Sequence, residues 1–298
     1  MNWTTYIKEY TSYLKIERGL SRNTIENYIL DIEKLCSFLE QNTIEVSPVN
    51  ITEEIIQQFI YDISKDVNPR SQARIISGLK SFFSYLNFEE YRKDNPLVLI
   101  ETPKLGRKLP DTLSVEEIDA LIDAIDLSSH EGERNRAILE TLYGCGLRVS
   151  ELVELKISDL FFDEGFIKVT GKGNKQRFIP IGGMTQKYIE LYRNEVRNFQ
   201  NVHKGHEDTL FLNRRGKKLT RAMIFTIIKR LAVKIDLQKT IRPHTFRHSF
   251  ATHLLQNGAD LRSIQLMLGH ESITTTEVYV HLDRAYLNTI INTYHPRK

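Results

Sequence analysis

Residues 242–255 are RPHTFRHSFATHLL and residues 268–281 are LGHESITTTEVYVH, and these two stretches hold an unusual density of histidine, arginine and tyrosine. The first is typical of a helix, and His244 and Arg247 lie three residues apart on it, so they share one face. A helix that presents both a cation and an imidazole is suited to binding and transforming an anion.

The second stretch predicts a helix, a corner and another helix. Gly269 ends the first helix and Ser272 caps the second, which places His270 in the corner between them. Tyr279 then lies about two turns into the following helix.

Two further stretches contribute candidates. Residues 144–152, GCGLRVSEL, contain Arg148, and residues 170–177, TGKGNKQR, contain Lys172 between two glycines. Arginine matches non-bridging phosphate oxygens bidentately, histidine and lysine move protons, and tyrosine is a covalent nucleophile. Taken singly each residue has an ordinary structural explanation, whereas together they indicate phosphate chemistry that needs neither a metal nor a cofactor.

A metal site is the alternative for the histidines. His244 and His248 have i, i+4 spacing, and His203 and His206 form another pair. Zinc enzymes with helical histidine pairs add a carboxylate between them and a third ligand. Here an arginine, Arg247, lies between the first pair, so we expect no metal.

The composition predicts a globular protein of two domains. The 298 residues are 41% hydrophobic and 27% charged, with two cysteines, which excludes disordered and disulfide-rich classes. No run of about 18 apolar residues predicts a membrane span. The start, MNWTTYIKEY, does not resemble a signal peptide, and we expect a cytoplasmic protein.

The net charge of +3 conceals opposed regions. Residues 1–105 carry a net −3, whereas residues 165–250 carry 19 basic and 5 acidic side chains. Such a local excess predicts a polyanionic partner, with nucleic acid as the leading candidate. The alternative is a basic face that only aids solubility.

The expected fold is mainly α. Residues 1–93 predict a four-helix bundle, residues 94–111 a proline-containing linker, and residues 112–298 a mostly helical domain with a small antiparallel sheet. The sheet is expected from strands within 161–171 and 176–181, and TLFL at 209–212 is a further candidate strand.

We expect six basic residues to bind DNA. Three lie on, or directly before, the helix predicted from SQARIISGLKSFFSYL, where residues 67–88 contain no acid, although surface-exposed arginines on a core helix are an equal alternative. The others lie in the basic stretch 165–250. The residues are Arg70, Arg74, Lys80, Lys175, Arg177 and Arg242.

These stretches resemble the tyrosine recombinase (phage integrase) family, and within it the chromosomal Xer branch, over essentially the whole chain. The length, GLRVSEL and the final His295-Pro296-Arg297 resemble the D type of Xer recombinase more than the C type. The family motif is Arg, Lys, His-x-x-Arg, His or Trp, and Tyr. Every position is filled: Arg148, Lys172, His244, Arg247, His270 and Tyr279.

The resemblance implies a SAM-like core-binding bundle, a catalytic domain, and chemistry like that of type IB topoisomerases. Tyr279 would attack a DNA phosphate to give a 3′-phosphotyrosyl intermediate, Lys172 would protonate the 5′ oxygen, and His244 would act as the base. Neither a cofactor nor a metal is implied.

The arginines would clamp that phosphate. The resemblance implies this for Arg148 and Arg247, with a hydrogen bond from His270. Glu151 is expected to orient Arg148.

The resemblance also implies partners. Such enzymes exchange strands in pairs as tetramers on double-stranded DNA carrying a specific site. We expect a homologous C-type recombinase in a heterotetramer, an FtsK-like DNA translocase, no membrane, and a role in resolving chromosome dimers during cell division. A mobile-element integrase with the same chemistry and a non-catalytic helical DNA-binding regulator are the alternatives.

The last segment, DRAYLNTIINTYHPRK, carries apolar residues at helical spacing. The resemblance implies that it packs against a neighbouring protomer and helps to regulate activity. Docking on its own domain is the alternative.

Overall fold

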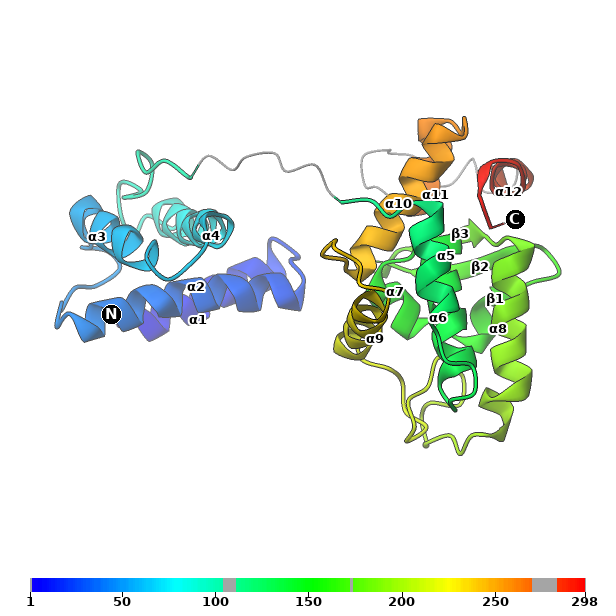
Figure 1. Ribbon diagram of the computed structural model, residues 1–298. Coiled ribbons are helices and arrows are strands. Elements are labelled where there is room, and N and C mark those ends of the chain that lie inside the picture. Colours follow the sequence, from blue (N-terminus) through cyan, green and yellow to red (C-terminus); the bar gives the residue numbers. More distant parts are fainter. Residues whose placement is uncertain (1, 104–110, 172–173, 270–282, 298) are drawn as a thin grey trace. The chain divides into compact units, whose positions relative to one another are not determined.

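The computed structural model describes residues 2–103, 111–171, 174–269 and 283–297, and it divides into two compact units, Met1–Lys108 and Leu109–Lys298 (Figure 1). No helix among these described residues is both long enough and apolar enough to cross a membrane.

The first unit is the predicted four-helix bundle. Ser21 caps one helix by accepting from the Thr24 N–H, and Asn68 caps another by accepting from the Ser71 N–H. Pro69 occupies the first turn of that last helix, where its missing N–H costs nothing. The helices are α1 (Trp3–Ile16), α2 (Arg22–Gln41), α3 (Glu53–Ile63) and α4 (Pro69–Phe88).

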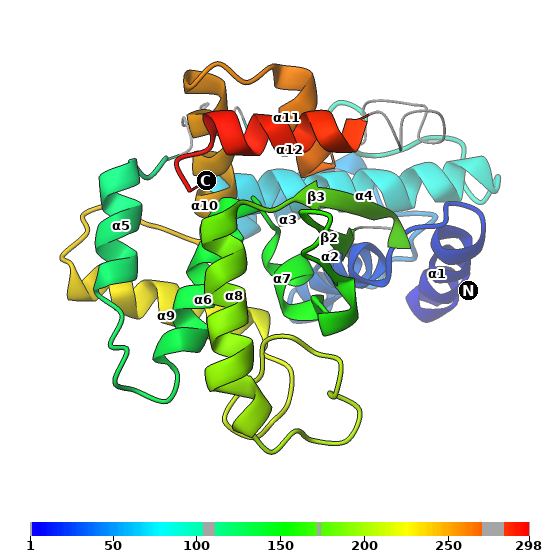
Figure 2. The same cartoon turned by 90° about the vertical axis from the view of Figure 1, so that its right-hand side faces the viewer.

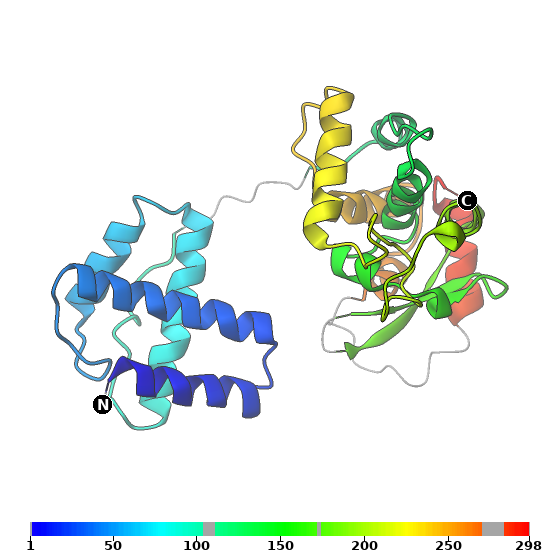
Figure 3. The same cartoon turned by 90° about the horizontal axis from the view of Figure 1, so that it is seen from below.

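A buried carboxylate marks the contact between α2 and α4, which cross in Figure 3. Asp31 is 0% exposed, and its Oδ2 accepts from Arg74 Nη1 at 2.6 Å. A Cβ on Gly78 would lie 2.6 Å from the same oxygen, so only glycine lets the helices approach this closely.

The predicted linker begins too early. Leu97 and Ile100 are buried in the core of the first unit, and Lys80 Nζ donates to the Ile100 carbonyl at 2.8 Å. The Asn95 side chain donates to the carbonyl of Lys80. The chain therefore stays on the first unit through residue 100, because its apolar side chains cover the end of the bundle.

The second unit is helical around a small sheet, as predicted (Figure 1). Its first helix, at residue 115, carries the capping box that Ser114 and Glu117 predict. The elements before the third strand are α5 (Val115–Asp123), α6 (Gly132–Gly144), α7 (Val149–Glu154), η1 (Ile157–Asp159), β1 (Leu160–Phe161) and β2 (Phe166–Thr170). Those that follow are β3 (Gln176–Pro180), α8 (Gly183–Glu195), η3 (Arg197–Phe199), α9 (Arg221–Lys234), α10 (Pro243–Gln256), α11 (Leu261–Leu268) and α12 (Asp283–Tyr294).

The strands form one antiparallel sheet in the order β1-β2-β3. The register pairs Ile167 with Ile179 and Val169 with Arg177, so these four side chains share one face. TLFL at 209–212 is not a strand: Thr209 and Leu212 form only isolated bridges with residues outside the sheet.

The C-terminal helix α12 docks on its own unit, where it contacts β3, α10 and α11 (Figure 2). Leu287, Ile290 and Ile291 are buried in the core of this unit. The next turn is also inserted, since His295 is 0% exposed. Two arrangements are expected for this segment, packing against a neighbouring protomer or docking on its own domain. The structure shows it docked on its own domain.

Candidate active site

The first element of the site is the start of α7. Arg148 precedes this helix, and Glu151 lies in its first turn. Glu151 Oε2 accepts from the Arg148 backbone N–H at 2.8 Å, and Oε1 accepts from Arg148 Nη1 at 2.9 Å. One carboxylate thus accepts from both the backbone at the helix start and the guanidinium of Arg148, and a role in orienting Arg148 stays a prediction.

A second arginine holds the same carboxylate. Arg177, on β3, donates from Nη1 to Glu151 Oε1 at 2.8 Å and from Nη2 to Oε2 at 2.9 Å. Fork-to-fork pairing of this kind fixes geometry as well as charge. Glu151 is therefore saturated by four hydrogen bonds from two arginines.

The third arginine comes from α10. Arg247 is 3% exposed and donates from Nη1 to the Gly146 carbonyl at 2.9 Å. Gly146 takes a positive φ of 58°, and a Cβ there would lie 2.5 Å from the Phe250 ring. This glycine lets the loop before Arg148 pass close to α10, so both arginines belong to one site.

All three arginines meet the end of α11. Three consecutive carbonyls each accept from a different guanidinium: Met267 from Arg177 Nε at 2.9 Å, Leu268 from Arg247 Nη2 at 2.5 Å, and Gly269 from Arg148 Nη2 at 3.5 Å. The last carbonyls of a helix lack intrahelical donors and carry its negative dipole end. The arginines donate hydrogen bonds to these carbonyls and place positive charge at the negative end of the helix dipole.

The cluster carries a net positive charge. Among the described hydrogen bonds of the three arginines, Glu151 is the one carboxylate acceptor. Burial raises the pKa of that carboxyl, but the bonds and charges of Arg177 and Arg148 outweigh burial and hold the pKa below its usual range. Burial, with the nearby charge of Arg148, lowers the pKa of Arg247 to about 10. At neutral pH the cluster keeps an excess of positive charge, which favours binding of an anion.

The remaining predicted catalytic residues divide into two groups. His244 is exposed in the first turn of α10, three residues before Arg247. Lys172, His270 and Tyr279 lie outside the described residues. Their neighbours are described: Gly171 begins the turn after β2, and Gly269 ends α11 beside the arginines.

The six residues predicted to bind DNA also differ in their surroundings. Arg70, Lys175 and Arg242 are exposed. The other three make contacts inside the protein, with Asp31, the Ile100 carbonyl and Glu151: Arg74, Lys80 and Arg177. For these three a structural role is established, and DNA contact stays a prediction.

Sequence reasoning missed the place of Arg177. The alternation of side chains along the strand could have shown that Arg177 is partly buried. Ile179 faces the core, and Arg177, two positions earlier, must share that face. The local charge excess concealed this signal, since an arginine among basic residues resembles a DNA contact.

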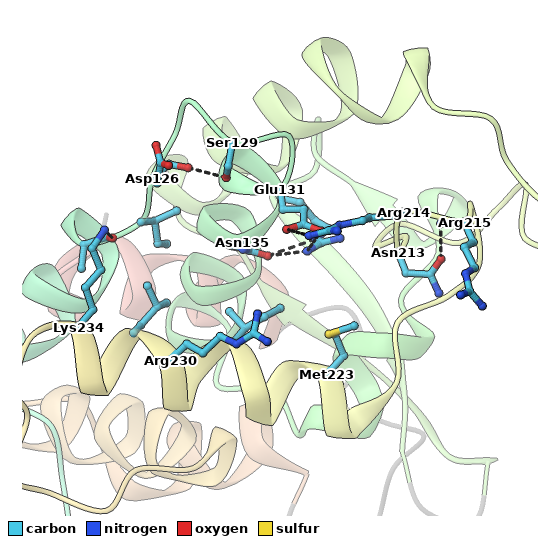
Figure 4. Close-up of a pocket in the computed structure, with 15 residues that line it drawn as sticks. Asp126, Ser129, Glu131, Asn135, Asn213, Arg214, Arg215, Met223, Arg230 and Lys234 are labelled. Carbon is cyan, nitrogen blue, oxygen red and sulfur yellow. Dashed lines mark hydrogen bonds and ion pairs between the residues drawn. The ribbon is translucent and has the colours of Figure 1, made fainter.

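A charged cavity of about 640 Å³ lies elsewhere in this unit, between α9 and the segments around residues 126–135 and 213–215 (Figure 4). Glu131 pairs with Arg214 across it, and Arg134 donates to the Asn135 side chain. Of the predicted catalytic residues that the structure describes, Arg148, His244 and Arg247, none lines it. Among the described residues no group of three or more His, Cys, Asp or Glu side chains is placed to hold a metal ion.

Comparison with known proteins identifies the class. Residues 111–285 match the phage integrase family, and residues 7–90 match the N-terminal SAM-like domain of phage integrases. The chain belongs to the phage integrase family.

Within that family it is an XerD-like tyrosine recombinase, and hence an enzyme. It is 44% identical over 294 residues to tyrosine recombinase XerD of Staphylococcus haemolyticus strain JCSC1435, covering 98% of this chain and 99% of the relative. It is 41% identical over 295 residues to XerD of Staphylococcus aureus strain Mu50, with the same coverage of 98% and 99%.

Solved structures of other recombinases and integrases have a similar fold. XerH recombinase bound to a palindromic difH substrate in a post-cleavage complex is 25% identical with a TM-score of 0.72, over 95% of this chain and 83% of that chain. A lambda integrase (75–356) dimer bound to a COC′ core site is 19% identical with a TM-score of 0.71, over 93% and 100%, and shares the fold.

Proposed function

We propose that the protein cuts and rejoins double-stranded DNA at a specific site through a 3′-phosphotyrosyl intermediate. The Tyr279 oxygen attacks the scissile phosphorus, and the bond from phosphorus to the 5′ oxygen breaks. His244 receives the tyrosine proton, and Lys172 gives a proton to the 5′ oxygen. The new phosphodiester keeps the bond energy, so the reverse attack by a 5′ hydroxyl rejoins the strand without a nucleotide.

The single observation that supports this proposal is the arginine cluster at the end of α11. Arg148 keeps 37% of its side chain exposed while Glu151 fixes its orientation, so it is placed to bind a phosphate oxygen. Arg247, buried beside it, adds charge in a site of low dielectric, where it stabilises an anionic transition state more strongly than in water. His270 follows Gly269 directly and would donate a hydrogen bond to the same phosphate.

A nicked suicide substrate tests the chemistry. After cleavage, the nick lets the short fragment that carries the new 5′ hydroxyl diffuse away. The covalent protein–DNA complex therefore accumulates and appears as a shifted band on a denaturing gel. We expect the band with the unaltered protein and none with Tyr279→Phe. A band that persists in Tyr279→Phe would overturn the assignment of the nucleophile.

The same assay separates the enzyme from a non-catalytic DNA-binding regulator, which would shift DNA on a native gel but give no covalent band. Arg148→Ala should lose about 3–4 kcal/mol of transition-state stabilisation, a rate loss of several hundred-fold, by analogy with removing an oxyanion donor.

For the biological role, we propose resolution of chromosome dimers during cell division, in the cytoplasm. The support is similarity to XerD proteins over 98% of the chain at 41–44% identity. The partners would be a homologous XerC-like recombinase in a heterotetramer on DNA and an FtsK-like translocase. Deleting the gene should raise the fraction of cells with unresolved chromosomes, whereas a mobile-element integrase would leave that fraction unchanged.

A further inference from the structure

Arg177 occupies an unusual place for a residue of a basic stretch. It lies on β3 opposite Val169, on the buried face of the sheet, and only 15% of its side chain is exposed. All three of its nitrogens donate within the protein, two to Glu151 and one to the Met267 carbonyl. A side chain so engaged has little capacity left for DNA.

Its contacts join parts of the chain that are distant in sequence. The Glu151 contact reaches α7 and, through that carboxylate, Arg148. The Met267 contact reaches the end of α11, 90 residues away, just before His270. Arg177 thus connects the phosphate-binding arginine with the segment that leads to a second catalytic residue.

Two glycines show how closely the chain surrounds this side chain. A Cβ on Gly269 would lie 2.9 Å from Arg177 Cδ and 3.1 Å from Nε. A Cβ on Gly171, next to Lys172, would lie 3.4 Å from Nη1 and 3.5 Å from Glu151 Oε1. Gly171, directly after β2, therefore lies against both Arg177 and Glu151, and Gly269, at the end of α11, lies against Arg177.

We propose that Arg177 is a positioning residue for the recombinase reaction, which fixes Arg148 through Glu151 and anchors the end of α11, and that it is not a DNA contact. This inference rests on the proposed function for its kinetic test. Lysine cannot replace arginine here, because one ammonium cannot bond both carboxylate oxygens in a plane and a carbonyl on a third side.

The first test compares Arg177→Lys with the unaltered full-length protein on the nicked substrate. Misplacing a reacting group by about 1 Å costs on the order of 100-fold in rate, and we expect a loss of that size in covalent-complex formation. Affinity for a duplex should change by less than about threefold, and its dependence on salt should not change. Because lysine keeps the charge, the salt dependence is measured in Arg177→Gln, where a slope reduced by about one would identify Arg177 as a phosphate contact and overturn the proposal. An unchanged rate in Arg177→Lys would overturn it as well.

Arg197→Lys is the matched control. Arg197 is also buried, at 6% exposed, and donates to the carbonyls of Thr209 and Glu207. Its substitution should lower thermal stability with little effect on the rate. An equal rate loss in Arg197→Lys would show that loss of any buried arginine suffices, and would overturn a positioning role.

A second readout does not depend on activity. Amide hydrogen exchange in residues 261–269 should accelerate in Arg177→Lys and stay unchanged in Arg197→Lys, because only the former loses an anchor of α11. If the unaltered protein forms no covalent complex, the proposed function fails, while this exchange measurement still decides whether Arg177 holds α11. Unchanged exchange in Arg177→Lys would overturn the anchoring.

The pH dependence of covalent-complex formation provides a third readout. Arg148, Arg177 and Arg247 are the described charged groups that act on Glu151. In Arg177→Gln the burial of Glu151 meets less opposing charge, so the pKa of this carboxyl should rise, and covalent-complex formation should decline at a higher pH than in the unaltered protein. Parallel pH profiles would contradict the coupling.

Discussion

The backbone N–H and the guanidinium of Arg148 both donate to the carboxylate of Glu151. The bond to the backbone fixes where α7 begins, and the bond to the side chain fixes where the guanidinium points. A single carboxylate therefore links the local fold of the loop to the orientation of the residue that we assign to phosphate binding. Both groups are held by contacts within the protein, which is the preorganisation that electrostatic catalysis requires.

Glu151→Gln should destabilise the second unit by about 3 kcal/mol, because removal of the charge leaves buried guanidiniums unbalanced. Urea unfolding followed by circular dichroism measures the change. Glu154→Gln is the control on the same helix: its side chain is 59% exposed and pairs with Lys218 at the surface, so we expect a change below about 0.5 kcal/mol. Equal effects would contradict the role of Glu151.

Gly269→Ala should be more harmful than Gly19→Ala. Both glycines have positive φ, 64° and 56°, so alanine costs about 1 kcal/mol of backbone strain at either position. A Cβ on Gly19 meets nothing within 4 Å, whereas a Cβ on Gly269 displaces Arg177. We therefore expect a slower covalent reaction only for Gly269→Ala, measured on the nicked substrate. A matching loss in Gly19→Ala would mean that strain alone is responsible.

Arg70 and Arg74 lie on one helix but should respond differently to substitution. Arg70→Gln should reduce the salt dependence of binding to duplex DNA by about one unit of slope. Arg74→Gln should destabilise the first unit by about 2 kcal/mol, because Asp31 loses its partner while buried. The single tryptophan, Trp3, lies in this unit near Phe82 and reports its unfolding by fluorescence. A drop in stability for Arg70→Gln without loss of affinity would contradict this division.

His295 should make the second unit sensitive to acid. Burial lowers the pKa of its imidazole to about 3, from an ordinary value of 6.5. The unfolded chain then binds a proton more readily than the folded one, so stability is complete above about pH 6.5 and decreases as pH falls below it. Between pH 6.5 and 5 the loss should be about 1.5 kcal/mol.

His295→Phe isolates that contribution. The ring position lies beside Tyr143 and Phe250, at centroid distances of 4.7 and 5.3 Å, which suit an aromatic replacement. Urea unfolding at both pH values should show a weaker dependence on pH in the variant. The same dependence in both proteins would rule out His295 as its source.

Local features of the fold could be predicted from the sequence. The helix caps at Ser21 and Ser114 and the antiparallel pairing of β2 with β3 each depend on residues close together in the sequence. The pairing of Arg148 with Glu151 is equally local. The place of Arg177 on the buried face of β3 also followed from strand alternation, although we interpreted its charge instead.

Contacts between distant segments could not be predicted. Nothing local to Arg177 specifies the Met267 carbonyl 90 residues away, and nothing local to Leu97 specifies that it packs into the core of the first unit rather than forming a linker. The surface on which α12 docks is likewise a property of the assembled unit, since an amphipathic helix can cover any apolar surface of matching shape.

The inserted C-terminal turn has a practical consequence. Arg297 pairs with Asp119 and with Glu140, whose side chain is 0% exposed, so the turn at residues 295–297 forms part of the interior. Loss of residues 295–297 would therefore remove contacts from the core of the second unit. Labels and surface tethers for this protein should avoid this turn.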